Sequence, residues 1–344
     1  GGYSGVSPQI FLFGYYGYGN LGDELMADYY RTLLAELFPG LERRLLVGPA
    51  FCRPLLAGER PGNRWHLPQL AWSTRPGALW VAGGGNLLQN ATSRRSLYYY
   101  LSLLKLARGR GARVVLLGQG FGPLVGRLDV ALARWVLARV DLVEARDDES
   151  WCAFRAMGLE PSRLYRGVDP LWDLVLPPAP ATGDGLLLIL RQPEFPALQR
   201  LAQAALAQGL AVKAVALAPS DEPFLKRACP RFYHGLVRDL QEFVAALAGV
   251  GLVASSRLHG LILAAKAGFP VVGIGGPPKI QACCRGLGQT WYAADDRELA
   301  TLSLRRLQAA GGAGLSRRVR ELQSQGRKVK GELAAVLTRL VGDG

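Results

Sequence analysis

The sequence predicts an α/β protein with two Rossmann-like, doubly wound domains, and three observations carry this prediction. Short apolar runs alternate with longer amphipathic stretches up to about Asp296, which is typical of βαβ units in parallel sheets. The chain has 344 residues, 49% of them hydrophobic, which exceeds one typical domain and suffices for two cores. Residues 176–185, rich in Pro, Ala and Gly, interrupt the alternation before it resumes at Leu186, and this indicates a linker.

The first domain is expected over residues 1–175. Apolar runs that end in Gly or polar residues predict its strands, and amphipathic stretches predict the helices that follow them. The expected strands are Ile10–Phe13, Leu45–Val47, Leu79–Ala82, Val114–Leu117 and Leu142–Ala145. The expected helices are Asp23–Leu37, Arg94–Arg108, Arg127–Arg139 and Asp148–Met157.

The second domain, expected over residues 186–312, repeats the scheme. Its expected strands are Leu186–Leu190, Ala211–Ala216, Leu252–Ala254 and Val271–Ile274, and its expected helices are Pro196–Gln208, Asp239–Ala248, Leu258–Ala267 and Ile280–Gly286. Ligands of such sheets bind beyond the carboxyl ends of the strands, so we expect the two domains to face each other across a ligand-binding cleft. A basic helix over residues 313–344 could pack back on the first domain, by analogy with folds of this kind.

Composition narrows the possible locations. No 18 consecutive residues are apolar, so no membrane-spanning helix is expected. Residues 1–5 have neither the basic region nor the apolar stretch of a signal peptide and resemble a trimmed start, so the cytoplasm is the expected location. The five cysteines form no CxxC pair, and neither a zinc site nor a disulfide scaffold is expected.

Charge narrows the possible partners. The net charge is +14, and the segment beyond Ala300 holds nine basic against three acidic residues, a net charge of +6. This surplus favours anionic substrates or contact with an anionic membrane, although a solvated, arginine-rich helix has the same composition. No aromatic and basic RNA-binding motif is present, so nucleic acid is not an expected partner.

The stretch GYYGYGNLGD at residues 14–23 has the G-x-G-x-x-G spacing of a dinucleotide-binding loop. Two features argue against a dinucleotide. No acidic residue ends the second strand to hold a ribose, and Asp23 with Glu24 would repel a pyrophosphate. These two carboxylates could instead contact a hydroxylated substrate or only favour the helix dipole, with Asn20 as the cap.

Further polar and glycine residues of the first domain follow its strands and are candidates for binding an acceptor or an anion. Glycines let backbone approach a ligand closely, and hydroxyls and arginines at a helix start are typical of anion sites. With Gly17 and Asn20, the candidates are Gly84, Asn86, Arg94, Arg95, Gln119 and Arg146. Arg146 could equally pair with the acidic residues that follow it.

The second domain contains the clearer group of candidate site residues, because strongly polar side chains follow its strands in otherwise apolar sequence. Arg191 follows the first strand, Ser256, Arg257 and His259 follow the third, and Lys279 follows the fourth. Such groups are costly to bury without a ligand or partner. His259 differs from the other histidines because it lies at a predicted helix start, two residues from an arginine.

Five motifs, in this order along residues 10 to 290, resemble the polysaccharide pyruvyl transferases. They are Gly14-Tyr-Tyr-Gly-Tyr-Gly-Asn-Leu-Gly-Asp-Glu24, Gly83-Gly-Gly-Asn-Leu-Leu-Gln89 with Thr92-Ser-Arg-Arg-Ser96, Gly118-Gln-Gly-Phe-Gly-Pro123, Arg146-Asp-Asp-Glu-Ser150 and Ser256-Arg-Leu-His259. The resemblance extends to the bacterial cell-wall branch, which adds a 4,6-linked pyruvyl ketal to N-acetylmannosamine of a secondary cell-wall polymer on which surface-layer proteins dock.

The resemblance implies a GT-B-like fold, phosphoenolpyruvate as co-substrate, no bound cofactor and no metal. On this interpretation Arg191, Ser256, Arg257 and Lys279 bind phosphoenolpyruvate, and His259 is the general acid. Asp23 or Glu24 is the base for the attacking hydroxyls. Gln192-Pro193 after Arg191, and Gly276-Pro277 before Pro278-Lys279, depart from the family pattern.

The expected enzyme is therefore a transferase acting on a lipid-linked cell-wall glycan precursor, with the basic tail contacting the inner face of the plasma membrane. A GT-B glycosyltransferase that uses a nucleotide sugar is the first alternative. It is disfavoured because no Asp or Glu lies between Val250 and Lys279 to hold a ribose. A non-catalytic glycan-binding module is the second alternative.

Overall fold

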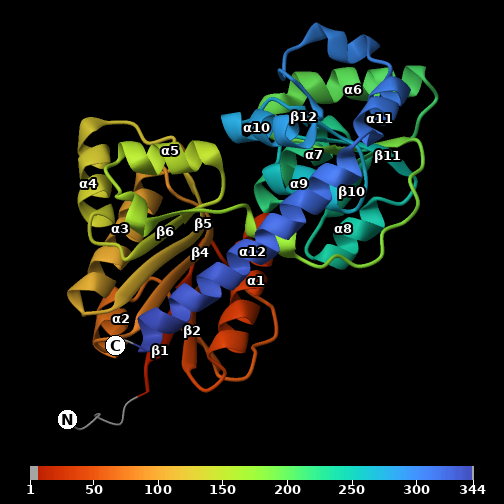
Figure 1. Ribbon diagram of the computed structural model, residues 1–344. Helices are drawn as coiled ribbons and strands as arrows, with labels where there is room; N and C mark the ends of the chain where they lie inside the picture. The colour runs from red at the N-terminus through yellow and green to blue at the C-terminus, as the bar shows by residue number, and fades with distance from the viewer. Residues whose placement is uncertain (1–6, 343–344) are drawn as a thin grey trace. The chain divides into compact units, whose positions relative to one another are not determined.

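The computed structural model describes residues 7–342 and shows two compact units (Figure 1). The first unit combines the chain up to Tyr18 with Asp23–Pro170 and the chain from Gln325, whereas the second combines Gly19–Gly22 with Leu171–Ser324. The expectations about the chain start and about residues 343–344 lie outside the described residues.

The sheet of the first unit contains, within the described residues, seven parallel strands in the order β3-β2-β1-β4-β5-β6-β7. The strands are β1 Gln9–Phe13, β2 Glu42–Val47, β3 Glu59–Asn63, β4 Leu79–Leu88, β5 Arg113–Phe121, β6 Leu142–Ala145 and β7 Leu164–Arg166. The order reverses direction between β1 and β4, the position at which doubly wound sheets bind ligands.

Helices cover both faces of this sheet, because its strands are apolar on both sides. On one face, α3 (Arg94–Gly109), α4 (Arg127–Leu137) and α5 (Asp148–Ala156) pack on Phe11, Trp80 and their neighbours, beside the short α2 (Leu67–Ser73). On the other face, α1 (Leu21–Leu37) and the last part of α12 (Leu315–Gly342) pack on Ile10, Leu12 and Val81. Leu333 and Leu337 of α12 are buried in that core.

Two glycine-rich stretches that were expected to follow strands belong to the strands themselves, and this corrects the expected strand ends at Ala82 and Leu117. Strand β4 continues through Gly83–Gly85 and β5 through Gly118–Gly120, with Gly83 paired to Leu117 and Gly85 to Gln119. A side chain has no room at two of these positions, since a Cβ would lie 2.5 Å from the Met26 sulfur at Gly84 and would collide with the Tyr30 hydroxyl at Gly118, and both residues belong to α1. These glycines therefore let a strand pass close under a helix.

The second unit repeats the strand order with six described strands, β10-β9-β8-β11-β12-β13, all parallel. They are β8 Gly185–Ile189, β9 Val212–Ala216, β10 Tyr233–Leu236, β11 Val250–Ser255, β12 Val271–Ile274 and β13 Thr290–Tyr292. The helices are α6 Phe195–Ala207, α7 Glu222–Ala228, α8 Leu240–Ala246, α9 Leu258–Lys266, α10 Pro278–Leu287 and α11 Leu304–Gly312.

The units depart in two places from the expected domain boundaries. Residues 19–22 of the opening loop pack with the second unit, where the Leu21 amide donates to the Leu217 carbonyl at 2.8 Å. The tail also divides, since the first turns of α12 belong to the second unit and the chain from Gln325 to the first. The positions of these boundaries could not be read from local sequence, because both depend on contacts between distant segments.

Candidate functional site

Charged and hydroxyl side chains gather at the carboxyl ends of β8 and β11, the two strands at which the second sheet reverses its order. Arg191 follows β8, and its backbone amide donates to the Ser256 hydroxyl at 3.0 Å. The Arg191 guanidinium donates from Nη2 to Oε1 of Glu194 at 2.8 Å. Ser256 therefore fixes the backbone at Arg191, and Glu194 fixes the direction of its side chain.

Arg257 follows β11 and is held by a carboxylate in the same manner. Its Nε and Nη2 donate to the two oxygens of Asp221 at 2.9 and 2.8 Å, a bidentate pair. The Arg257 side chain is 27% exposed, whereas that of Asp221 is 7% exposed. The guanidinium thus keeps an accessible side, with Nη1 outside the pair.

His259 lies in the first turn of α9, half-buried, against the opening loop. A Cβ at Gly22 would collide with Nδ1 of His259, so the imidazole occupies the space that only a glycine leaves. Pro219 fills the corresponding space at Gly19. Lys279 lies in the first turn of α10 rather than in a loop, after the neighbouring strand β12.

Glu194 and Asp221 were not predicted, because the search for acidic residues covered only Val250 to Lys279. Both are buried, and each neutralises one of the arginines predicted to bind an anion. The Arg191 Nε and the Glu194 Oε2 are buried without a hydrogen-bond partner among the described residues. The pairing of Glu194 with Arg191 could have been predicted from their spacing of three residues. Asp221 follows β9, and nothing in the local sequence indicated its pairing with Arg257.

The opening loop of the first unit is closed by its own backbone contacts. Gly17 has φ +81°, and a Cβ there would lie 2.5 Å from the backbone of Gly48. Glu24 is 7% exposed and accepts from the amides of Gly17 at 2.6 Å and Tyr18 at 3.2 Å. The structure therefore gives Glu24 the task of holding this loop, which leaves Asp23 as the more accessible of the two predicted bases.

Asp23 lies beside the glycine-rich end of β4. It is half-buried, and a Cβ at Gly85 would lie 3.3 Å from its Oδ1. Tyr16 is buried nearby and donates to the Gly83 carbonyl. Burial, followed by the Asp23 charge, raises the pKa of Tyr16 well above its ordinary value, so this hydroxyl stays a donor.

Three other predicted residues of the first unit point their polar groups into the protein. The Asn86 amide donates to the Gly122 carbonyl at 2.5 Å, and the Gln119 amide to the Gly84 carbonyl at 3.1 Å. The Arg146 guanidinium is buried against Gly120. The Asn86 Oδ1 and the Gln119 Oε1 are buried without a hydrogen-bond partner among the described residues, whereas Arg146 Nε forms an ion pair with Asp147 Oδ2 at 3.7 Å.

At the start of α3, where an anion site was predicted, Asp129 of α4 binds one of the two arginines. Arg94 donates to both oxygens of Asp129 at 3.1 Å, and Tyr98 donates to the same carboxylate at 2.6 Å. Hydrogen bonds from Arg94, Tyr98 and Asn90 hold the pKa of Asp129 well below its ordinary value. Arg94 is thereby neutralised, and Arg95 beside it is exposed.

An aromatic cluster beside the opening loop was also missed. The buried Arg64 guanidinium lies over the rings of Tyr18, Trp65, Tyr99 and Tyr100 at 4.8 to 5.7 Å. Tyr15 stacks on Tyr18 with ring centroids 4.5 Å apart, and Trp65 remains 63% exposed. These rings, which we call the aromatic platform, are Tyr15 and Tyr18 after β1, Trp65 after β3 and Tyr99 in α3. The signal that could have found them is the density of Tyr and Trp in these three segments.

Metal binding and membrane crossing were considered for the described residues. Across residues 7–342, no group of three or more His, Cys, Asp or Glu side chains is arranged to hold a metal ion. None of the helices described is long and apolar enough to cross a membrane.

Comparisons with solved structures show the fold. The Anabaena protein HepE, solved with UDP and glucose, matches at 13% identity and a TM-score of 0.59, over 96% of this chain and 100% of HepE. Sucrose-phosphate synthase of Thermosynechococcus elongatus matches at 12% identity and a TM-score of 0.64, over 98% and 100% of the two chains. The wall teichoic acid polymerase TagF matches at 10% identity and a TM-score of 0.61, over 97% and 89%.

The predicted fold class is thus confirmed: two parallel-sheet α/β domains of the GT-B type. At these identities the structures say nothing about substrate. A comparison with curated proteins finds no significant match.

Sequence comparison identifies the family, as the motifs suggested. A profile of the family described as "Polysaccharide pyruvyl transferase" matches residues 20–276, which is most of the chain. The matched range contains Arg191, Arg257 and His259, whereas Lys279 and α12 lie outside it. The chain therefore belongs to the polysaccharide pyruvyl transferase family, and it is a transferase.

Proposed function

We propose that the protein moves the pyruvyl group of phosphoenolpyruvate onto a sugar of a cell-wall polysaccharide precursor as a 4,6-ketal, with N-acetylmannosamine as the first sugar to test. The observation that carries this proposal is the gathering of Arg191, Ser256, Arg257 and His259 at the switch point of the second sheet. Membership of the family supports the reaction class.

The donor suits this edge because phosphoenolpyruvate carries a carboxylate and a phosphate. Glu194 and Asp221 already hold Arg191 and Arg257 in one orientation, so these side chains lose little conformational entropy when an anion binds. The two acids also lower the positive charge of the empty site. A doubly charged phosphate with its carboxylate supplies the anionic charge that Lys279 and the accessible sides of the guanidinium groups can bind.

The proposed reaction is balanced as follows. The protonated imidazole of His259 gives its proton to the methylene carbon of phosphoenolpyruvate, and one sugar hydroxyl attacks the adjacent carbon. The bond between this carbon and the bridging oxygen of the phosphate breaks, the second hydroxyl closes the ketal, and hydrogen phosphate leaves. Of the two hydroxyl protons, one restores His259 and the other leaves with phosphate, so no oxidant or reductant is consumed.

Chain connectivity supports His259 as acid and Asp23 as base. The imidazole of His259 lies against Gly22 within the second unit, and Asp23 is the next residue in the chain. Glu24, the other predicted base, already accepts two backbone amides. Asp23 is therefore the proposed group that accepts a proton from the acceptor hydroxyl and passes it to the leaving phosphate.

The acceptor chain is proposed to lie on the aromatic platform of the first unit. Exposed rings held rigid by a buried cation offer apolar area with little conformational entropy to lose, which suits the apolar faces of sugar rings. The platform flanks the loop that ends at Asp23, so a glycan resting on it extends toward the proposed base.

A nucleotide-sugar glycosyltransferase is the alternative enzyme, and the acids found in the structure do not favour it. Glu194 and Asp221 lie at this edge, but each is bound to an arginine and buried. They are thus engaged rather than positioned to accept hydrogen bonds from ribose hydroxyls. The cytoplasmic location, the lipid-linked acceptor and contact of the basic tail with an anionic membrane remain parts of the proposal.

The test is to incubate the protein with phosphoenolpyruvate and a synthetic acceptor that ends in N-acetylmannosamine. We expect phosphate release and an acceptor mass increased by a pyruvyl ketal. His259→Ala should reduce turnover by about 10²- to 10⁴-fold, the usual contribution of a general acid. His234→Ala is the matched control, because His234 is exposed on β10.

Turnover with a nucleotide sugar and none with phosphoenolpyruvate would overturn the proposed donor. Undiminished turnover in His259→Ala would overturn the proposed acid and favour a non-catalytic role for this residue.

A further inference from the structure

Helix α4 of the first unit has large apolar side chains on both its inner and its outer face. Its inner face packs on the sheet through Ala133, Val136 and Leu137. Its outer face carries Leu128, which is 62% exposed, and Trp135, which is 47% exposed. A helix that packs on a core on one side normally has polar residues on the other, so these outer side chains suit a surface that binds something.

The outer apolar side chains form one stripe. Leu128, Leu132 and Trp135 are spaced by four and three residues, which places them on the same side of the helix. Val125, just before α4, is 73% exposed. Asn90 holds the backbone of Val125, because its amide donates to the Val125 carbonyl at 2.6 Å and its Oδ1 accepts from the Val125 amide at 3.0 Å. We call Val125, Leu128, Leu132 and Trp135 the α4 stripe.

Basic side chains flank the α4 stripe. Lys105 of α3 lies over the ring of Trp135, with Nζ 4.5 Å from the ring centroid. Three exposed arginines lie on α4 or directly after it: Arg127, Arg134 and Arg139. None of these four cations forms an ion pair with a residue that the structure describes. The acid of α4, Asp129, is buried and bound to Arg94, so it does not offset their charge.

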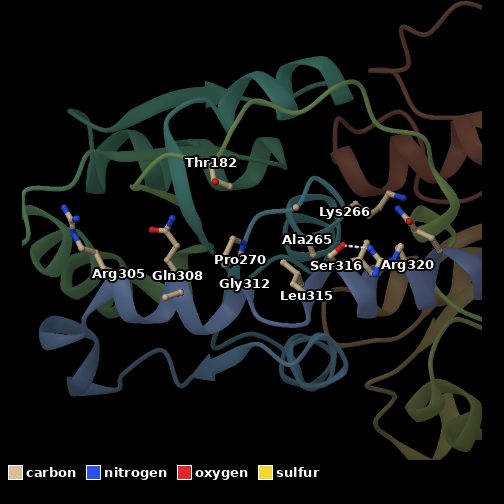
Figure 2. Close-up of a pocket in the computed structure, with 14 residues that line it drawn as sticks. Thr182, Ala265, Lys266, Pro270, Arg305, Gln308, Gly312, Leu315, Ser316 and Arg320 are labelled. Atoms are coloured by element: carbon tan, nitrogen blue, oxygen red, sulfur yellow. Dashed lines mark hydrogen bonds between the residues drawn. The ribbon is translucent and has the colours of Figure 1, made fainter.

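Helix α12, the basic tail that was expected to contact a membrane, has no such stripe. None of the exposed large apolar side chains of residues 7–342 lies on it, and Leu315, Val319 and Leu333 are buried. Figure 2 shows Leu315 in the wall of a pocket of about 560 Å³ in the second unit, beside Arg320, which donates to the Ser316 hydroxyl. Cations without apolar neighbours attract a bilayer only through charge, which salt screens.

We propose that the α4 stripe seats the first unit on an anionic lipid bilayer, with Leu128 and Trp135 at the boundary of the acyl chains and Arg127 and Arg134 among the headgroups. Leucine and tryptophan are side chains that interfacial helices insert, and arginines beside them reach lipid phosphates along their apolar stems. A second copy of this chain is a poorer occupant, because the chain itself has a net charge of +14.

This inference deepens the proposed function and rests on it for its purpose, because a lipid-linked acceptor is met at the surface of a bilayer. The α4 stripe shares no residue with the donor edge at β8 and β11. The experiment therefore contains neither phosphoenolpyruvate nor acceptor, and vesicle binding can fail while turnover succeeds, or succeed while turnover fails.

The first measurement is cosedimentation of the whole chain with vesicles of phosphatidylglycerol and phosphatidylcholine at physiological ionic strength, which screens long-range attraction. Leu128→Gln with Trp135→Gln should lower the partition coefficient about tenfold or more, because two inserted side chains are lost. Trp72→Gln with Leu206→Gln is the matched control, because Trp72 is 86% exposed and Leu206 is 56% exposed away from the α4 stripe. This control should bind as the parent protein does.

The charges are tested separately, and these variants change only exposed side chains. Arg127→Gln with Arg134→Gln should lower the partition coefficient about tenfold, since each basic residue near an anionic surface contributes about 1 kcal/mol. Arg227→Gln with Arg231→Gln removes two exposed cations of the second unit and should retain binding. Unchanged melting temperatures show that each variant is folded.

The second measurement is hydroxyl-radical oxidation of the tryptophans, peptide by peptide, with and without vesicles. Vesicles should protect Trp135 about threefold or more, because an inserted ring leaves water, while Trp72 is oxidised unchanged.

Four outcomes would overturn the proposal. They are absence of binding to the vesicles, equal binding of the Leu128→Gln, Trp135→Gln variant and its control, unprotected Trp135 in the vesicle-bound protein, and self-association that the same variant abolishes. Binding with Trp135 unprotected would assign the contact to the basic tail alone.

Discussion

The carboxyl edges of the two sheets share one strand order but use their polar side chains differently. In the first unit, Glu24 and Asn86 satisfy backbone groups of the protein, and glycines admit α1 close to β4. In the second unit, Arg191 and Arg257 stand partly exposed, each aimed by a buried acid. Glycine-rich strand ends therefore do not by themselves mark an ionic site, and partly exposed guanidinium groups distinguish the edge of the second sheet.

Two ion pairs sharpen this comparison. Arg94 with Asp129 and Arg257 with Asp221 each form two hydrogen bonds through Nε and Nη2. Arg94, however, is 61% exposed on a helix surface, and Arg257 is 27% exposed beside Ser256 and His259. Equal geometry thus serves helix packing in one unit and orients a candidate ligand group in the other.

The largest effect is expected from a pair of glycine substitutions. Gly22→Ala places a Cβ against Nδ1 of His259, in a helix that tolerates alanine, so kcat/KM should fall about 100-fold while the melting temperature changes little. Gly17→Ala forces a left-handed residue against Gly48 and should destabilise the fold by roughly 1–3 kcal/mol. Kinetics and thermal unfolding measure both, and a fully active Gly22→Ala would contradict the role of His259.

The next largest effect is expected from substituting the two acids that hold arginines, Asp221 and Asp129. Asp221→Asn should loosen Arg257 and raise KM for phosphoenolpyruvate by about tenfold, because a guanidinium without its bidentate partner no longer keeps one orientation. Asp129→Asn should leave that KM unchanged and lower stability at neutral pH instead. The pKa of Asp129 is depressed in the folded state, so its stabilisation is present above the unfolded pKa of about 3.9 and is lost as pH falls.

An increase in KM for both variants, or for neither, would remove the contrast between the two pairs. Steady-state kinetics with varied phosphoenolpyruvate and unfolding curves at several pH values provide the two measurements.

A buried acid of the first unit gives a third prediction. Burial raises the pKa of Glu144 to about 8, and its Oε1 accepts from the Gly118 amide at 2.7 Å. The folded protein therefore holds a proton that the unfolded chain has lost above about pH 4.3, so stability falls with rising pH across the interval between these values.

The slope is about 1.4 kcal/mol for each pH unit within that interval. Glu144→Gln should flatten this part of the stability profile, measured by denaturant unfolding from pH 5 to 9. Parallel profiles for the variant and the parent protein would show that Glu144 is ionised in the folded state.

The smallest effect concerns the aromatic platform. Trp65→Ala should raise KM for a polymeric acceptor by about threefold to tenfold, the contribution of one aromatic contact, and leave KM for phosphoenolpyruvate unchanged. Trp72→Ala is the matched control, because Trp72 is 86% exposed and lies outside the platform. Equal effects of the two substitutions would exclude the platform as the acceptor site.

Much of the fold was predictable because it rests on local patterns. Apolar runs such as Ile10–Phe13 and Leu186–Leu190 predicted strands that the structure contains, with small shifts at their ends. Short or polar strands, β3 and β13 among them, were not predicted because they lack an apolar run. The family motifs could also be recognised from the sequence, because each is a short run of consecutive residues.

Only the tertiary structure decided which partner each charged side chain binds. Sequence reasoning placed Arg191, Arg257 and His259 together, because the carboxyl ends of parallel strands meet at one edge. It could not foresee that Asp221, 36 residues before Arg257, neutralises that guanidinium, or that Gly22 makes room for His259. Periodicity and motifs are properties of neighbouring residues, whereas ion pairing and steric exclusion depend on which distant segments the fold brings within a few ångströms.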